Sequence, residues 1–367
     1  MNDKNRLMSL DVLRGADMLY LGVIYNLVIS ASESFGFADR AAHPFMRQFD
    51  HYWGGFTVID IVMPLFIFMC GAAIPFALFK RMDENGRPTV RYWRHVVSRV
   101  VLLWILGMVS QGRLLTLDPM AISPFNNTLQ TIAVGYAITA IVICLGSRAW
   151  RVIAAVALAV GYAVALCAWG DYGRDSNLAQ VFEQKVLSWM CPQGSRAFRT
   201  SGYTWFATVP MFGFMALCGF HATEIIRSGL GPWRKSVLLA VLGVSFLAVG
   251  WICELCGIPC IKHIFTLSFT LQAMGWCFLL LDFFYVLIDV LGFRRGWWML
   301  VLYGQASLAA YMFGDIFACI VDGASKVFTV GMPRLVGTQA MPFVIKIMSA
   351  ILLTYGLFVW RRFKSRG

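Results

Sequence analysis

One stretch of the sequence places ionisable side chains directly beside a membrane-length apolar run. It reads HYWGGFTVIDIVMPLFIFMCG, from His51 to Gly71. A carboxylate such as Asp60 near the water end of a span is costly unless it is paired, lines a cavity or takes part in function. Histidine titrates near neutral pH and serves many enzymes as a general base. We therefore expect His51 to be a catalytic base, with Asp50 or Asp60 orienting its ring.

The first apolar run carries polar residues at both of its ends. Ser9, Asp11 and Arg14 lie near its start, and Asp11 and Arg14 are three residues apart, so they share a helical face. The pair is either an ion pair with an interfacial anchor or a cationic contact for a phosphorylated cytosolic ligand. Asn26 lies toward the other end of the run. It either bonds to a neighbouring helix or faces the same compartment as His51.

The composition indicates a membrane protein. The chain has 367 residues, of which 59% are hydrophobic and only 14% are charged, so it has too little polar surface for a soluble protein of this size. Spans that face lipid must satisfy their backbone polar groups internally, which predicts an all-α polytopic fold. No linker or internal repeat divides the chain, and we treat 1-367 as one transmembrane domain. We place ten spans, each able to cross a bilayer core about 30 Å thick, near residues 10-31, 56-80, 96-112, 127-146, 150-169, 203-225, 235-254, 264-290, 298-321 and 341-361.

The basic residues are concentrated in the loops on one predicted side of the membrane. The net charge is +12, and most of the 31 Lys and Arg residues fall in alternate loops that share a side with the N-terminus. The positive-inside rule places this side, with both termini, in the cytoplasm, which requires an even number of spans. The charge is thus a topology signal, and we expect no nucleic-acid partner.

One turn contains a cysteine pattern that resembles a metal site. It reads CELCGIPCIKH and carries Cys253, Cys256, Cys260 and His263, a spacing that zinc or iron-sulfur clusters use. The turn is predicted to be extracytoplasmic, where a disulfide forms more readily than a metal site, and unpaired cysteines also pack as small apolar side chains. We expect no metal, and the sequence does not decide between a disulfide and packed thiols. Lys262 in this turn is a cation at the entrance to a span.

Four blocks of the sequence resemble the transmembrane acyltransferases related to heparan-alpha-glucosaminide N-acetyltransferase. They are SLDVLRG with the downstream Asn26, then DHYWGGFTVIDIVMPLFIFMCGAAI, NTLQTIAVGY and PCIKHIFTLSF, between Arg6 and about Leu308. The second block is the most specific. In this family the active-site histidine precedes a stretch of the form N/G-x-T-x-x-D-x-x-x-P, as His51 does here.

The resemblance implies an activity and a set of roles. Members of this family take an acetyl group from cytosolic acetyl-CoA and place it on the amino group of a glucosamine across the membrane. For this chain it implies a multi-pass enzyme of the bacterial inner membrane. Its co-substrate would be acetyl-CoA, and its acceptor an amino sugar or glycan. We also expect contacts with membrane lipid and a homodimer. The matching positions are His51, Asn26 and Asp60 for catalysis, Ser9, Asp11 and Arg14 for the cofactor, and Asp50 and Lys262 for the substrate.

The sequence also departs from the family and leaves other functions open. Ile261 and Phe265 replace the usual Asn and Trp, Ala306 replaces an asparagine, and the loop between Asn26 and His51 is longer. These differences bear on the acceptor, so an O-acyltransferase of envelope glycans remains an alternative. A secondary transporter is a second alternative, since intramembrane carboxylates also serve ion or solute paths. The carboxylates that suit such a path are Asp60, Asp282 and Asp315.

Overall fold

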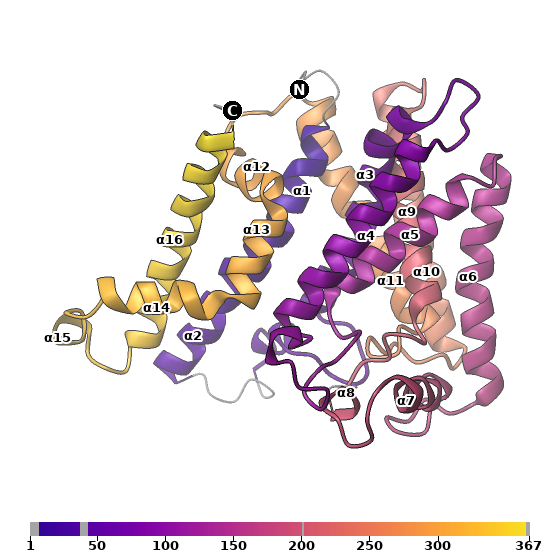
Figure 1. Cartoon of the computed structure of the whole chain (residues 1–367). Helices are drawn as coiled ribbons and strands as arrows, with labels where there is room; N and C mark the ends of the chain where they lie inside the picture. Colours follow the sequence, from indigo (N-terminus) through magenta and orange to yellow (C-terminus); the bar gives the residue numbers. More distant parts are fainter. Residues whose placement is uncertain (1–6, 37–42, 200–201, 365–367) are drawn as a thin grey trace. The chain divides into compact units, whose positions relative to one another are not determined.

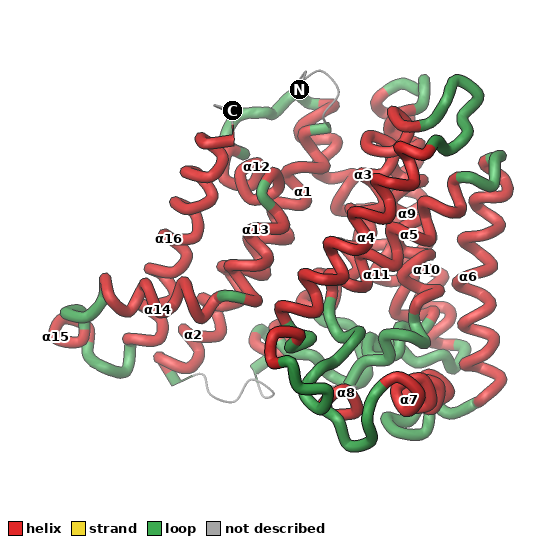
Figure 2. Tube along the Cα trace, viewed as in Figure 1, coloured by secondary structure: helices red, strands yellow, loops and turns green. Residues whose placement is uncertain are grey.

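The computed structural model describes residues 7–36, 43–199 and 202–364, without the side chains of Asp315 and Lys364. Across these residues the chain is helical and has no β-strand (Figure 2). Several helices begin at polar residues that accept a hydrogen bond from the first turn, among them Thr89 before α4 and Asn127 before α5. Such caps replace bonds that the free ends of a helix lack. The predicted all-α polytopic class is confirmed.

Eight helical segments of the described chain are long and apolar enough to cross a membrane. A further apolar helix, α5 (Thr128–Ile143), is shorter, so the predicted number of ten spans stays a prediction. The eight segments are Met8–Phe35, Val58–Arg81, Val90–Ser110, Arg148–Trp169, Val209–Arg227, Pro232–Leu255, Leu267–Val290 and Met341–Phe363.

The predicted span at 298–321 is not one straight helix. It is divided into α12 (Trp298–Gln305), α13 (Ser307–Tyr311), a π-helical turn (Met312–Ile316) and α14 (Ala318–Phe328). The segments Ser307–Gly314 and Ala318–Phe328 meet at an angle of 68°. A π-helical turn shifts the hydrogen-bond ladder by one residue, and kinks often occur there.

The chain folds into two compact units, and the single transmembrane domain expected from the sequence stays a prediction. Unit 1 comprises Met1–His51, Thr57–Val62 and Phe283–Gly367, and unit 2 comprises Tyr52–Phe56 and Met63–Asp282. The helices of unit 1 are α1 (Met8–Leu19), α2 (Tyr25–Phe35), α12, α13, α14, α15 (Pro333–Val336) and α16 (Met341–Lys364). The helices of unit 2 are α3 (Val62–Leu78, from its second residue), α4 (Val90–Ser110), α5, α6 (Arg148–Trp169), α7 (Leu178–Met190), α8 (Arg196–Arg199), α9 (Val209–Arg227), α10 (Pro232–Leu255) and most of α11 (Leu267–Tyr285).

Unit 1 is built around the packing of α1 against α12. A Cβ atom on Gly304 would lie 1.9 Å from the Asp11 carbonyl oxygen, and one on Gly15 would lie 1.7 Å from the Leu300 carbonyl oxygen. Only glycine allows two helix backbones to approach so closely, as is common between membrane helices. Figure 1 shows the start of α1 and the end of α16 at the same end of this unit, as termini on one side of the membrane require.

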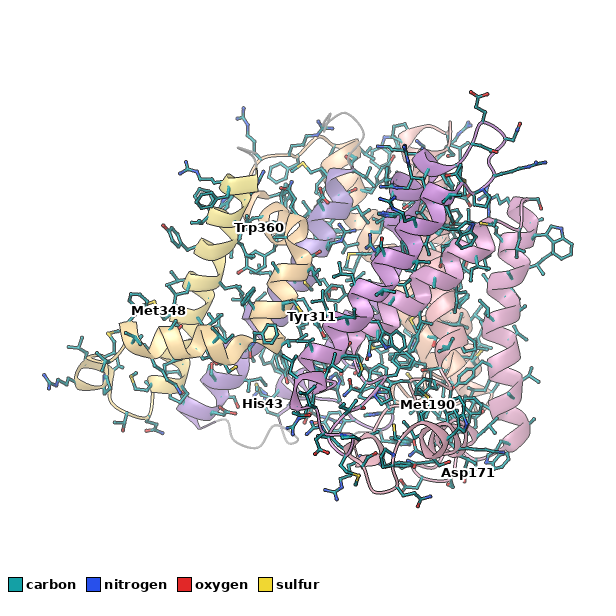
Figure 3. All side chains as sticks on the ribbon, viewed as in Figure 1. His43, Asp171, Met190, Tyr311, Met348 and Trp360 are labelled. Carbon is teal, nitrogen blue, oxygen red and sulfur yellow. The ribbon has the colours of Figure 1, made fainter. Side chains whose placement is uncertain are left out.

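In unit 2, glycines also allow close backbone contact between α3 and α9. Cβ atoms on Gly71 and Gly219 would each lie 1.8 Å from a carbonyl oxygen of the facing helix. Helices α4 and α5 run antiparallel, because the Tyr92 hydroxyl near the start of α4 donates to the Ala140 carbonyl near the end of α5 at 2.6 Å. Loops gather beside α7 and α8 at one end of this unit, where Asp171 precedes α7 and Met190 is its last residue (Figures 2 and 3).

Candidate active site

His51 and Asp60 lie in direct contact in unit 1. The Nδ1 atom of His51 is 2.7 Å from the Asp60 Oδ1 atom. The Asp60 side chain is 2% exposed, whereas the His51 side chain is 39% exposed. A buried carboxylate thus holds an imidazole that reaches the surface of the unit, and this carboxylate is one of the two that the sequence offered as a partner for His51.

Thr57 fixes the position of Asp60. A short 3-10 helix, Val58–Ile61, precedes α3 and begins after Thr57, and Asp60 is its third residue. The Asp60 Oδ2 atom accepts the Thr57 backbone N–H at 3.0 Å and the Thr57 hydroxyl at 2.7 Å. This is a capping-box arrangement, which a threonine followed three residues later by an acidic side chain favours. The T-x-x-D spacing therefore has a structural role, and it also leaves Oδ1 directed at the histidine.

The contact decides how the imidazole presents its protons. As a carboxylate, Asp60 only accepts hydrogen bonds, so Nδ1 of His51 carries the shared proton. In the neutral ring Nε2 then carries the lone pair, which is the arrangement a general base needs. Asp50 does not take this position, because its Oδ1 accepts the backbone N–H of His51 at 2.9 Å. Of the two carboxylates considered from the sequence, Asp60 orients the ring.

Aromatic side chains hold the segment before His51 against the first span. Phe49 stacks on Tyr20 with ring centroids 6.0 Å apart and lies 6.5 Å from the ring of Tyr25. The Tyr20 hydroxyl is buried without a hydrogen-bond partner among the described residues, and it interacts electrostatically with Asp60. Sequence reasoning missed Tyr20, since a tyrosine in an apolar run gives no signal until the loop is seen folded over it.

The structure does not bring Asn26 to His51. The Asn26 amide nitrogen contacts the carbonyl oxygens of Leu21 and Gly22 at 3.3 Å and of Gly314 at 3.4 Å. These bonds span two π-helical turns that face each other, Tyr20–Ile24 and Met312–Ile316. Of the two interpretations offered by the sequence, these contacts match the bond to a neighbouring helix.

A small cavity with polar and apolar lining lies beside Asn26. It has a volume of about 20 Å³, enough for one water molecule. The Lys346 ammonium is 2.6 Å from the Asp322 Oδ2 atom, and the Ser349 hydroxyl donates to Asp322 Oδ1 at 2.7 Å. Both Asp322 and Lys346 line the cavity with Asn26. The cavity is too small for a sugar.

The predicted cofactor residues occupy the start of α1. The Arg14 guanidinium is 3.7 Å from the Asp11 carboxylate, and both side chains are largely buried. Ser9 is fully buried, and within the described ranges its hydroxyl has no hydrogen-bond partner. The expected Asp11 and Arg14 pair is thus present, together with a buried hydroxyl two residues before Asp11.

Lys262 belongs to unit 2 and is buried in a turn packed with aromatic rings. The neighbouring His263 lies 4.5 Å from the ring of Tyr203 and 5.2 Å from that of Trp53, measured between centroids. The backbone N–H of Gly55 donates to the Cys260 carbonyl at 2.8 Å, which ties this turn to the Gly-Gly segment after His51. The buried Cys260 thiol is 3.9 Å from the Gln272 side-chain oxygen. In the described part of the chain, no three His, Cys, Asp or Glu side chains are grouped closely enough to hold a metal ion.

Glu183 is a buried carboxylate that sequence reasoning missed. It lies on α7, and its Oε2 atom accepts the backbone N–H groups of Phe206 at 2.8 Å and Ala207 at 3.3 Å. Burial raises the pKa of Glu183 to about 7, against the opposing effect of these hydrogen bonds. The sequence shows only a glutamate in an amphipathic helix, without the loop that folds over it.

The carboxylates considered for a transport path do not form a described cluster. Asp60 belongs to unit 1 and Asp282 to unit 2. One Asp282 oxygen is buried and meets no hydrogen-bond donor in the described part of the structure. The Asp315 side chain lies outside that part.

Part of the chain is similar to a known family. Residues 6–114 match a family described as a domain of unknown function (DUF5009). The match covers the start of α1, His51, Asp60 and α4, and it ends well before Lys262. No curated protein matches the chain.

Proposed function

We propose that this chain is a membrane-embedded acetyltransferase that moves an acetyl group from cytosolic acetyl-CoA to the amino group of a glucosamine-type sugar on the other side of the membrane. The observation that supports it most is the contact between His51 and Asp60. A histidine held by a buried carboxylate, next to the start of an apolar helix, is the arrangement of an oriented general base.

The chemistry requires one base and one acid. The amine nitrogen of the sugar forms a bond to the thioester carbonyl carbon, and the Nε2 atom of His51 removes a proton from this nitrogen. The C–S bond then breaks, and the imidazolium returns the proton to the departing thiolate of CoA. Asp60 stabilises the imidazolium during this step, because the charge develops 2.7 Å from its oxygen. The proton taken from the amine thus ends on the thiol of CoA, and the electron pair of the broken C–S bond stays on the CoA sulfur.

The remaining residues are assigned by position. Ser9, Asp11 and Arg14 serve the cytosolic entrance for acetyl-CoA, and Asp50 and Lys262 contact the acceptor. Asn26 would serve as an oxyanion donor only after turning its amide away from the carbonyl oxygens it now contacts. We place the protein in the bacterial inner membrane as a multi-pass homodimer with both termini cytoplasmic.

A direct assay tests the proposal. Purified protein in detergent is mixed with acetyl-CoA and a panel of amino sugars and hydroxyl acceptors, and products are read by mass. We expect an N-acetylated amino sugar and free CoA. Products on hydroxyl acceptors alone would identify an O-acyltransferase instead. No consumption of acetyl-CoA with any acceptor would contradict the proposal and favour a transporter.

The same preparation separates the two possible routes of transfer. An acetyl-histidine intermediate requires labelled enzyme after incubation with acetyl-CoA alone. We expect no label on His51 and intersecting lines in two-substrate kinetics, since Asp60 supports proton transfer by the ring. Label on the peptide that contains His51, with parallel lines, would establish the covalent route.

A further inference from the structure

Arg99 lies inside a candidate membrane span and faces the protein interior. It is the tenth residue of α4, which runs from Val90 to Ser110. Its guanidinium lies 4.8 Å from the ring centroid of Tyr136 on α5, and its Nη2 atom is 3.9 Å from the Cys70 sulfur on α3. A charged side chain directed into a bundle of spans is costly and marks a functional site by default.

The cations around Arg99 have no carboxylate partner among the described residues. Neither Arg99 nor Arg81 forms an ion pair there, and Arg81 donates to the Ala77 carbonyl at the end of α3. His95 lies one turn before Arg99 and interacts electrostatically with both arginines. Three side chains that carry or can carry positive charge thus interact here, one from the 3-10 turn Phe79–Arg81 after α3 and two from the first half of α4.

Buried polar atoms on α4 and α5 also lack partners within the described chain. Tyr136 is 1% exposed, yet its hydroxyl has no hydrogen-bond partner in these residues. The same holds for the His95 Nε2 atom and for the hydroxyl of Thr139, which is fully buried and lies one turn after Tyr136 on the same face of α5. Buried polar groups are nearly always bonded, and exceptions call for an explanation.

Interfacial anchoring does not explain this group. Arg91 and Arg94 on the same helix are exposed, as expected for residues that follow the positive-inside rule. Arg99 instead lies over a ring that is almost completely buried. An anion between the guanidinium groups would supply both the missing charge and acceptors for the unpartnered donors. Phosphate fits, because guanidinium groups bind its oxygens through paired hydrogen bonds.

We propose that Arg81, His95, Arg99 and the Tyr136 hydroxyl form a phosphate-binding site within unit 2, reached from the end of α4 that the charge distribution places in the cytoplasm. The assignment rests on the proposed function, in which the phosphate belongs to acetyl-CoA. An anionic phospholipid of the inner leaflet carries the same chemical group, so the test must distinguish these sources.

The test measures binding to the full-length protein purified in neutral detergent. Dissociation constants for CoA, pyrophosphate and phosphate-free pantetheine are determined by calorimetry for the wild type, Arg99→Gln, Tyr136→Phe and the control Arg94→Gln. Anionic lipid that is retained through purification is measured by native mass spectrometry. Gel filtration and thermal unfolding report whether each variant is folded.

We expect Arg99→Gln to weaken binding of CoA and pyrophosphate by about tenfold or more, as loss of a charge-assisted bond implies. Tyr136→Phe keeps the ring and removes only the hydroxyl, so a loss of about threefold to tenfold is expected, and this variant keeps the test decisive if Arg99→Gln does not fold. Arg94→Gln should bind as the wild type does, and pantetheine binding should be unchanged in all variants.

Each alternative outcome has a distinct meaning. If both variants bind CoA and pyrophosphate as tightly as the wild type, the site is overturned, while the proposed function stands. If the wild type binds pyrophosphate but not CoA, and the variants lose this binding, the phosphate site is supported and the proposed function fails. If CoA binding is unchanged but retained anionic lipid is lost in the variants, the site holds a lipid phosphate and the assignment to CoA is overturned.

Discussion

The Nδ1 atom of His51 lies 2.7 Å from the buried carboxylate of Asp60, which is held in turn by the backbone N–H and the hydroxyl of Thr57. The cap residue Thr57 holds the Asp60 carboxylate in place, and this carboxylate holds the imidazole of His51. The hydrogen bonds that cap the short helix at Val58 thus also position Asp60, and through it the imidazole of His51 that we propose as the general base.

The first prediction concerns Asp60. In Asp60→Asn the amide keeps the shape but offers a weaker acceptor to Nδ1 and no charge for the imidazolium. We expect kcat for acetyl transfer to fall by roughly 10² to 10⁴, with little change in KM for acetyl-CoA. Steady-state kinetics measures this, with the exposed Asp118→Asn as control. Equal kcat for Asp60→Asn and the wild type would show that the carboxylate serves only the helix cap.

The second prediction concerns the pH dependence of stability. The pKa of Glu183 is about 7 in the folded protein and 4.5 as its ordinary value. Between these values the folded state binds more protons than the unfolded state, so the free energy of unfolding decreases as pH rises. Glu183→Gln should abolish this decrease and stabilise the protein at pH 8 by up to roughly 3 kcal/mol. Thermal unfolding from pH 5 to 8 measures it, with the exposed Glu84→Gln as control, and parallel curves for Glu183→Gln and the wild type would contradict it.

The third prediction tests the backbone contact at the centre of unit 1. A Cβ on Gly304 would overlap the Asp11 carbonyl oxygen, so Gly304→Ala must separate α1 from α12. We expect a large loss of folded protein, of several kcal/mol. Gly356→Ala in α16 is the matched control, since a Cβ there meets nothing within 4 Å. Similar yield and melting temperature for the two variants would show that α1 and α12 are not in backbone contact.

The fourth prediction concerns a largely buried ion pair in unit 2. The Glu224 carboxylate on α9 is 2.8 Å from Arg151 on α6 and 2.8 Å from His221. Glu224→Leu leaves the largely buried Arg151 without its carboxylate partner and should cost about 2 to 4 kcal/mol of stability. The double variant Arg151→Leu with Glu224→Leu should recover part of this loss. A double-mutant cycle with no coupling energy would contradict the prediction.

The sequence predicted the parts of the structure that depend on local pattern. Apolar runs of span length marked most of the helices. The sequence also offered Asp60, with Asp50, as a partner for His51, and the structure shows that Asp60 makes this contact. The sequence did not identify Tyr20 or Glu183, because each depends on a loop that folds over it from elsewhere in the chain. The break after Tyr311 was missed for a different reason, since the residues of 298–321 are mostly apolar and a π-helical turn leaves no mark in hydropathy.

Asn26 shows a different limit. Its position in the first span suited either a bond between helices or a catalytic amide, and the sequence could not decide which acceptor the amide meets. The structure supplies the carbonyl of Gly314, 288 residues away in the chain. Such a contact depends on the packing of the first span against a later one.

The most direct test of the account is acetyl transfer by His51→Ala. Purified wild-type protein and variant are given labelled acetyl-CoA and glucosamine, and the acetylated sugar is quantified by mass over time, with gel filtration and thermal unfolding to show that the variant is folded. We predict that the wild type forms N-acetylglucosamine. We also predict that His51→Ala folds correctly and still binds acetyl-CoA, but that its rate of acetyl transfer is lower by at least about 100-fold, the scale of general base catalysis. Transfer by His51→Ala at the wild-type rate would contradict the central claim.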